Sequence, residues 1–181
     1  MRKLFFKMSK YTKEIEICNK YLSGRKDFLD FAEKSAALRG NDNIIGRIGE
    51  FVVLQFLDDE GREPEINLSK NEKGYDILCD YDSIKGVKDT KVSVKVITSE
   101  NKLGRTTRLK EPWHEAFIII LNKNYKIEKM GRVRRSEFDF FRLTNPTIPK
   151  EPFAERKLLE KGGFLYECGE IYDKEFCSKY L

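Results

Sequence analysis

A chain of 181 residues is long enough for one domain with a hydrophobic core, and its length sets no narrower limit. Charged residues make up 36% of the chain and apolar residues 40%, a balance that excludes wholesale disorder and predicts a globular protein with a highly charged surface. The net charge of +5 is too small to identify a partner by itself. No apolar run approaches the roughly 20 residues of a membrane span, and the apolar stretch in MRKLFFKMSKY is too short for a signal peptide, so we expect a cytoplasmic protein without membrane contact.

The cysteines and the histidine do not form the pattern of a metal site or of a catalytic site. The cysteines form no C-x-x-C pair and lie at Cys18, Cys79, Cys168 and Cys177. With a single histidine, His114, the chain lacks the ligands of a zinc cage, so the pattern predicts reduced thiols. We assign His114 no catalytic role and expect its neighbour Trp113 to lie in the core.

Helices are predicted for the first part of the chain. Residues 12–38 carry apolar side chains at intervals of three and four, and Ser23 and Gly24 predict a break that divides the segment into two short helices. Residues 39–61 open with cap-forming asparagine and aspartate, continue apolar on nearly all sides and end at Gly61. That pattern predicts a buried helix.

Short segments rich in isoleucine, valine and phenylalanine follow, and they are predicted as strands at 64–69, 75–79, 92–97, 116–121 and 125–135. A short helical link is expected at 109–116, and a late helix at 152–163 that ends on two glycines. This order of elements predicts an α/β fold, in which helices flank a mixed central sheet.

We expect one domain in three parts. An N-terminal helical segment covers residues 1–40, a core covers 44–135, and a C-terminal extension of helix and strand covers 136–181.

A lysine and an aspartate stand out on two neighbouring strands. Because side chains alternate along a strand, Ser93 and Lys95 share one face of 92–97. A lysine in so apolar a strand must reach solvent or an anion. Asp76 lies at the start of the preceding strand, and a hairpin with its loop around 81–90 would bring it to Lys95. The alternatives are a lysine that protects a sheet edge and an aspartate that serves a turn or a plain ion pair.

Glu50 is a third polar group in apolar surroundings. It lies in the predicted buried helix, so it could converge with Asp76 and Lys95. The alternative is an ion pair with Arg47, three residues earlier on the same helix face.

Together, GRIGE at 46–50, GYDI at 74–77 and a strand that contains Val94–Lys95 resemble the PD-(D/E)XK nuclease superfamily, which has the restriction-endonuclease-like fold. The resemblance spans residues 44–98. It implies that Asp76 and Glu50 bind a metal, Mg²⁺ with Mn²⁺ as a substitute, and that Lys95 is catalytic. It also implies a DNA substrate and, by analogy with short nucleases that cut both strands, a homodimer.

Ser93 departs from the family pattern, which has an acid two residues before the lysine. A hydroxyl is a weaker ligand for Mg²⁺ than a carboxylate, so Ser93 belongs to the candidate catalytic set and also puts metal affinity in question. Asp80 and Glu100 are weaker ligand candidates nearby. We expect an Mg²⁺-dependent endonuclease that hydrolyses phosphodiester bonds in DNA, with type II restriction as one form of it. The alternatives are a nucleic-acid-binding module with a decayed catalytic site and a structure-specific junction or repair nuclease.

Basic residues outnumber acidic ones between Lys102 and Arg135, which suits a polyanion partner. A predicted glycine-containing loop supplies DNA-binding candidates with guanidinium, ammonium and hydroxyl donors: Arg105, Thr106, Thr107, Arg108 and Lys110. RVRRSEF at 132–138 is expected to add a second basic contact. Ordinary solvated surface is the alternative for both segments.

Overall fold

The computed structural model describes residues 11–32, 44–67, 74–82 and 87–181. The helices are α1 (Thr12–Ala32), α2 (Ile44–Asp59), α3 (Arg135–Thr144), α4 (Phe164–Cys168) and α5 (Lys174–Cys177), with 3₁₀ turns η2 (Lys102–Gly104) and η3 (Arg156–Leu159). The strands are β1 (Glu65–Ile66), β2 (Ile77–Asp82), β3 (Val87–Ile97), β4 (Arg105–Arg108), β5 (Glu115–Leu121), β6 (Ile127–Arg134), β7 (Phe153–Glu155) and β8 (Glu170–Asp173). Among the described helices, none combines the length and apolarity that crossing a membrane requires.

The main sheet has the strand order β1-β2-β3-β5-β6-β8, and β4 pairs with β7 in a separate small sheet. Strands β3 and β5 are parallel, whereas the other pairs in the main sheet are antiparallel. Every residue of β5 is buried, as a central strand covered on both faces should be. The predicted fold class, a mixed sheet flanked by helices, is confirmed.

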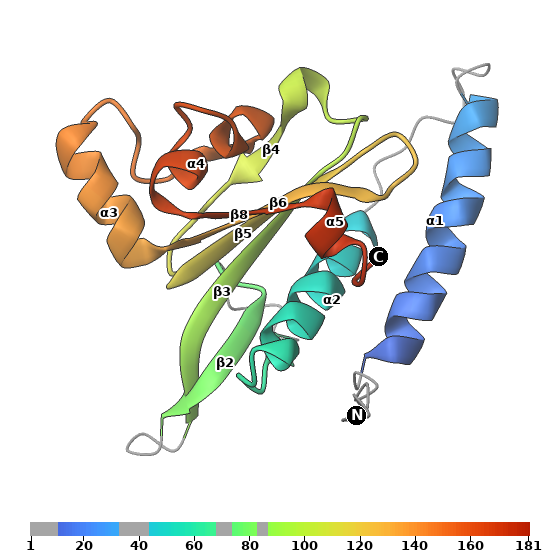
Figure 1. The fold of residues 1–181 in the computed structure, drawn as a ribbon, viewed down its shortest axis with the longest axis horizontal. Coiled ribbons are helices and arrows are strands. Elements are labelled where there is room, and N and C mark those ends of the chain that lie inside the picture. The colour runs from blue at the N-terminus through green and yellow to red at the C-terminus, as the bar shows by residue number, and fades with distance from the viewer. Residues whose placement is uncertain (1–10, 33–43, 68–73, 83–86) are drawn as a thin grey trace, which may run out of the picture.

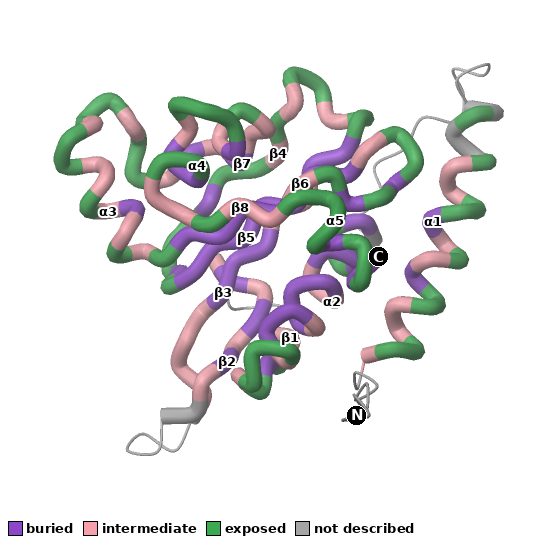
Figure 2. The backbone as a smooth tube through the Cα atoms, in the orientation of Figure 1, coloured by how far each residue is buried: buried purple, intermediate pink, exposed green. Residues whose placement is uncertain are grey.

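Two apolar cores lie on the two faces of this sheet (Figures 1 and 2). The first joins α1, α2 and α5 to one face through residues such as Val94 and Phe117. The second joins α3, α4, β7 and Leu109, directly after β4, to the other face through residues such as Ile97 and Ile118. The alternation of side chains therefore divides β3 and β5 between two cores.

Helix α2 lies at the centre of the first core. Its Phe56 ring packs on Phe117 of β5, and on Tyr180, with ring centroids 5.6 and 5.9 Å away. Tyr180 and Leu181 are buried there, and the Tyr180 hydroxyl donates to Asp59 at the end of α2. Segments from both ends of the described chain thus cover one helix.

The prediction of two short helices in residues 12–38 is wrong, because Thr12–Ala32 form one helix, α1. It runs unbroken through Ser23 and Gly24, both of which are exposed, while Cys18 and Leu22 are buried against the first core. A glycine in an exposed helix position costs only about 1 kcal/mol, which packing of the opposite face can offset. Residues 33–38 of the prediction lie outside the described residues.

Two further helix predictions are wrong. The expected link at 109–116 has no helix: the Leu109 amide donates to the Pro152 carbonyl and the His114 amide to the Lys91 carbonyl, so the chain bends between two strand contacts and enters β5 at Glu115. The expected late helix at 152–163 is instead β7 followed by the short turn η3. Both segments owe their shape to pairing with strands that are distant in sequence.

Candidate active site

Asp76 lies where the chain enters β2, beside β3. Its backbone amide donates to the Val92 carbonyl at 2.8 Å, so its position is fixed relative to the neighbouring strand. Beyond the last ladder pair of β2, Ile77 with Val92, the carboxylate accepts the Val94 amide at 2.7 Å. That hydrogen bond satisfies a backbone donor that the ladder leaves open and sets the direction of the side chain.

Gly74 makes this entry possible. Its φ is +97°, and a Cβ there would lie 2.4 Å from the Glu111 carbonyl oxygen, so both the backbone conformation and the space require glycine. Tyr75, the next residue, is buried. The GYD sequence therefore turns the chain tightly and presents Asp76 to β3.

Ser93 and Lys95 meet Asp76 on β3. Lys95 Nζ lies 3.7 Å from Asp76 Oδ2 and donates to the Val94 carbonyl at 3.2 Å. Ser93, only 1% exposed, donates its hydroxyl to the same Asp76 oxygen at 3.5 Å. The predicted hairpin between β2 and β3 is confirmed, and it brings these three side chains together.

Glu50 approaches from α2, because Gly49 lets the helix lie close to β3. A Cβ on Gly49 would stand 2.1 Å from Val96 Cγ2, so no other residue fits without movement. Glu50 is half-buried next to this contact, and Arg47 Nη1 lies 2.5 Å from its Oε2. The predicted ion pair with Arg47 is therefore present, although Glu50 Oε2 is buried and accepts no hydrogen bond from the described residues.

The electrostatics of Glu50 link it to the other two charges. Burial and the negative charge of Asp76 raise the pKa of Glu50 to about 7, while Arg47 and Lys95 act in the opposite direction. Positive charge near Glu50 would lower this pKa, because it stabilises the ionised carboxylate. A cation bound between Glu50 and Asp76 would therefore be electrostatically favourable.

The oxygen donors are compatible with Mg²⁺, which often uses one or two protein carboxylates and keeps several waters. Asp76 and Glu50 provide two carboxylates, and Ser93 a neutral oxygen, although Glu50 Oε2 already faces Arg47 Nη1 at 2.5 Å. Across residues 11–32, 44–67, 74–82 and 87–181, no group of three or more His, Cys, Asp or Glu could hold a metal ion. The site is thus one acid short of a three-carboxylate cage.

The weaker ligand candidates are engaged elsewhere. Asp80 forms a hydrogen-bonded ion pair with Arg62, and Glu100 pairs with Arg25 of α1 at 2.9 Å and accepts the Tyr125 hydroxyl. Both carboxylates therefore form structural ion pairs.

The DNA-binding candidates Arg105, Thr106, Thr107 and Arg108 form strand β4, where a loop was predicted. Thr106 is half-buried, whereas the other three side chains and Lys110 are exposed. Strand β4 pairs with β7 and packs near β3, so these donors have a defined place on the molecule.

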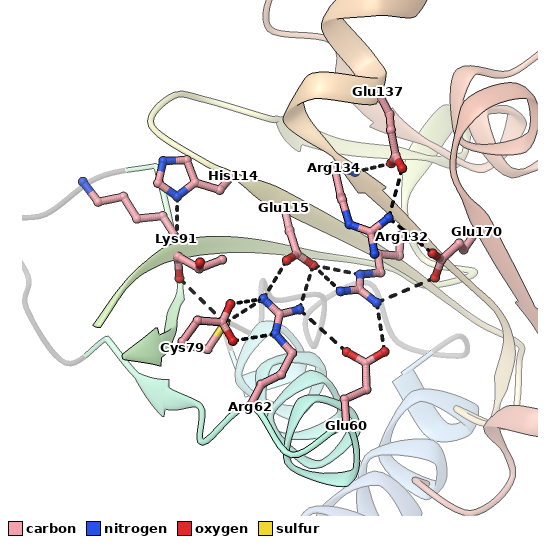
Figure 3. Close-up of polar contacts among 12 residues, drawn as sticks. Glu60, Arg62, Cys79, Lys91, His114, Glu115, Arg132, Arg134, Glu137 and Glu170 are labelled. Carbon is pink, nitrogen blue, oxygen red and sulfur yellow. Dashed lines mark hydrogen bonds and ion pairs between the residues drawn. The ribbon is translucent and has the colours of Figure 1, made fainter. Parts of the chain in front are cut away.

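A network of charged residues was not predicted (Figure 3). Arg62, which follows α2, pairs with Glu115 at the start of β5 at 2.6 Å. Arg132 of β6 pairs with the same Glu115 at 2.7 Å and with Glu60 at 2.9 Å. Burial would raise the pKa of Glu115, but the two arginines outweigh it and the pKa is lowered. The network therefore ties the end of α2 to the sheet through ionised groups.

This network lines an open hollow of about 490 Å³, with Glu60, Arg62, Glu115, Arg132 and Arg134 around it. All of these side chains make ion pairs with one another or, for Arg134, with Glu137 at 3.0 Å. The expectation of a second basic contact at 132–138 is accordingly wrong for Arg132, which is 5% exposed. A signal was present in the sequence, since Glu115 lies two residues before Phe117 and shares its face of β5, but the predicted helical link at 109–116 concealed it.

Comparisons with known proteins find similarity in structure and none in sequence. A scan against protein-family models finds no match, and a search of curated proteins finds none either. Among solved structures, the chain is similar to a bacterial homing endonuclease, I-Ssp6803I, at a TM-score of 0.45 and 16% identity over 73% of this chain and 88% of that chain. Similarity at this level describes an arrangement of strands and helices and assigns no activity to this chain.

Proposed function

We propose that this protein is a metal-dependent endonuclease of the PD-(D/E)XK type, which hydrolyses phosphodiester bonds in DNA with Mg²⁺. The observation that carries the proposal is the meeting of Ser93 Oγ and Lys95 Nζ at one carboxylate oxygen of Asp76. Glu50 supports it, because its pKa responds to both Asp76 and Lys95.

Each side chain has a task in this proposal. Asp76 is held in place by the Val94 amide, so it needs no reorganisation to bind a cation together with Glu50. Lys95 carries the positive charge that offsets the scissile phosphate and orients the attacking water. A divalent cation bound there would supply an acidified water and charge neutralisation.

Ser93 favours a second candidate function, a nucleic-acid-binding module that no longer cuts. With a hydroxyl where the family has an acid, the site offers a metal less negative charge. The module would keep the affinity for DNA and lose hydrolysis.

The deciding experiment is a nicking assay on supercoiled plasmid with Mg²⁺, with Mn²⁺ and with EDTA. We expect cleavage that requires a divalent cation, and loss of at least about a hundredfold in rate for Asp76→Asn and for Lys95→Ala, because each removes an interaction with reacting groups. Lys126→Ala, at an exposed lysine outside the site, is the matched control and should cut at the wild-type rate.

Two results would decide against the nuclease. Undiminished cleavage by Asp76→Asn would sink the site assignment. Failure to cut plasmid, single-stranded and four-way-junction DNA, combined with retained DNA binding, would establish the module.

The finer points of the proposal follow from the same assay. Discrete linear fragments would indicate a type II restriction activity, whereas cleavage confined to branched DNA would indicate a junction or repair nuclease. We further propose a homodimer, since two copies would present one site to each strand of a duplex; sedimentation equilibrium tests this.

A further inference from the structure

The small sheet of β4 and β7 contains a bulge. Arg105 pairs with Glu155 and Arg108 with Phe153, so three steps along β4 match two along β7. In a regular strand, residues three apart point to opposite faces, whereas the extra residue of a bulge returns the second side chain to the first face. The bulge therefore turns both arginines to one side.

Phe153 holds both guanidinium groups on that side. The Arg105 guanidinium carbon lies 4.7 Å from the centre of the Phe153 ring and that of Arg108 lies 4.2 Å away. Arg108 also donates to the Glu151 carbonyl at 2.9 Å. A guanidinium that stacks on a ring keeps in-plane N–H donors, which match the oxygens of a phosphate in a bidentate manner.

These two arginines are not neutralised. The remaining arginines of the described residues each pair with at least one carboxylate: Arg25, Arg47, Arg62, Arg132, Arg134, Arg135, Arg142 and Arg156. Arg105 and Arg108 make no ion pair with any carboxylate in the same described part. Two exposed like charges on one ring repel each other, so the arrangement favours a polyanion that contacts both.

The small sheet lies on the same face of the main sheet as the candidate catalytic lysine. Lys95 and Ile97 share one face of β3, and Ile97 packs in the core that also contains Leu109, directly after β4, and Ala154 of β7. Figure 1 shows β4 across the sheet from α2. A nucleic acid along β4 would thus run close to β3.

We propose that β4 and β7 form the nucleic-acid contact of this protein, in which Phe153 positions Arg105 and Arg108 against two phosphates of the backbone. The Thr107 hydroxyl, exposed between the arginines, offers a third donor. The inference rests on the proposed function only in taking DNA as the substrate, because binding can be measured without cleavage.

The test measures the affinity of the full chain for a fluorescent 30-base-pair duplex in EDTA, by anisotropy over a series of salt concentrations. Arg105→Ala/Arg108→Ala should weaken binding at least about tenfold and reduce the slope of log K against log salt by about 2, one for each phosphate contact. Lys123→Ala/Lys161→Ala removes the same charge from exposed positions elsewhere and should leave the slope unchanged.

Phe153→Leu separates positioning from charge. It keeps both arginines and an apolar side chain in β7, so we expect a loss of affinity of about fivefold with the wild-type salt slope. Arg105→Lys/Arg108→Lys should behave like Phe153→Leu, and it gives a second measurement in case the alanine double variant does not fold, which circular dichroism reports.

An unchanged slope in a folded double alanine variant would overturn the proposal, as would binding of polyglutamate, but not of duplex, through the same arginines. The outcome is separable from that of the nuclease. Arginine-dependent binding without Mg²⁺-dependent cleavage supports this contact and refutes the nuclease, and cleavage that ignores both arginines does the reverse.

Discussion

At the scale of single residues, Ser93 is where this chain differs most from the family that it resembles. The side chain is almost fully buried and hydrogen-bonds Asp76. An acid introduced at this position would therefore lie next to the Asp76 carboxylate. The electrostatic effect of one substitution can therefore reveal whether the position faces a cation.

Ser93→Asp should lower the melting temperature in EDTA by at least about 2–4 °C, since like charges and desolvation cost about 1 kcal/mol or more. Millimolar Mn²⁺ should then raise the melting temperature by more than in the wild type, because a third acid strengthens metal binding to the folded state. Differential scanning fluorimetry measures both shifts. Ser136→Glu, an exposed position in α3, is the control; an equal Mn²⁺ response in the two variants would exclude a metal at Ser93.

Two glycines of α2 should respond in opposite directions to alanine. Gly49→Ala places a methyl group 2.1 Å from Val96 Cγ2, and we expect a loss of about 1–3 kcal/mol in the free energy of unfolding. Gly46 has no heavy atom within 4 Å of such a group, so Gly46→Ala should gain about 0.5–1 kcal/mol from helix propensity. Urea denaturation compares the two variants. Equal effects would show that α2 does not press on β3 at Gly49.

Sequence patterns located Asp76, Ser93 and Lys95 because their relation depends on local regularities. Alternation along β3 and one hairpin are enough to bring them together. No local sequence pattern predicts the charged network around Glu115, since Arg62 and Glu115 are separated by 53 residues. The sequence indicates only that Glu115 shares a strand face with Phe117, so that a buried carboxylate there requires basic partners.

At the scale of elements, the errors fall where tertiary contacts override local preference. Ser23 and Gly24 suggested a break, but α1 continues through both while Cys18 and Leu22 pack against the first core. Residues 152–163 have helical spacing, yet the first of them pair with β4, more than 40 residues away. Strand pairing at such distance cannot be deduced from one segment.

The ionic tie between α2 and the sheet predicts acid sensitivity. Because the folded-state pKa of Glu115 is lowered, the carboxylate stabilises the fold above its unfolded pKa, near 4.5, and this contribution is lost as the pH falls through the folded value. Glu115→Gln should cost about 3 kcal/mol at pH 7, since it leaves two arginines short of a partner, and should flatten the loss of stability below about pH 4.5.

Asp80→Asn is the companion variant for that measurement. Arg62 lowers the pKa of Asp80 too, but this side chain is 40% exposed and screened, so the flattening should be smaller. Urea titrations between pH 3 and pH 7 provide the comparison. A steeper acid transition in Glu115→Gln than in the wild type would contradict the tie.

At the scale of the whole molecule, three buried cysteines report on the first core: Cys18, Cys79 and Cys177. The thiols are free, as predicted, and burial raises the pKa of Cys79 to about 12 and that of Cys177 to about 11. Cys18 is also buried, but on α1 at the outer side of the molecule, whereas Cys79 lies in the sheet (Figure 1).

We therefore expect slow labelling of the native protein at pH 8, with Cys18 ahead of Cys79, because thiols react as thiolates and buried ones react through local opening. Mass spectrometry after timed iodoacetamide treatment gives the order. Labelling in urea supplies the fully reactive reference. Reaction of Cys79 before Cys18 would mean that the sheet opens more readily than α1 detaches.

The packing of Tyr180 and Leu181 on α2 has a consequence for biosynthesis. Residues 44–97 include Glu50, Asp76, Ser93 and Lys95, but Phe56 of α2 packs on Tyr172 and Tyr180 as well as on Phe117 of β5. We therefore expect a chain under synthesis to contain all four residues before α2 can complete its packing, because the residues that reach Phe56 last, 172–180, are made later.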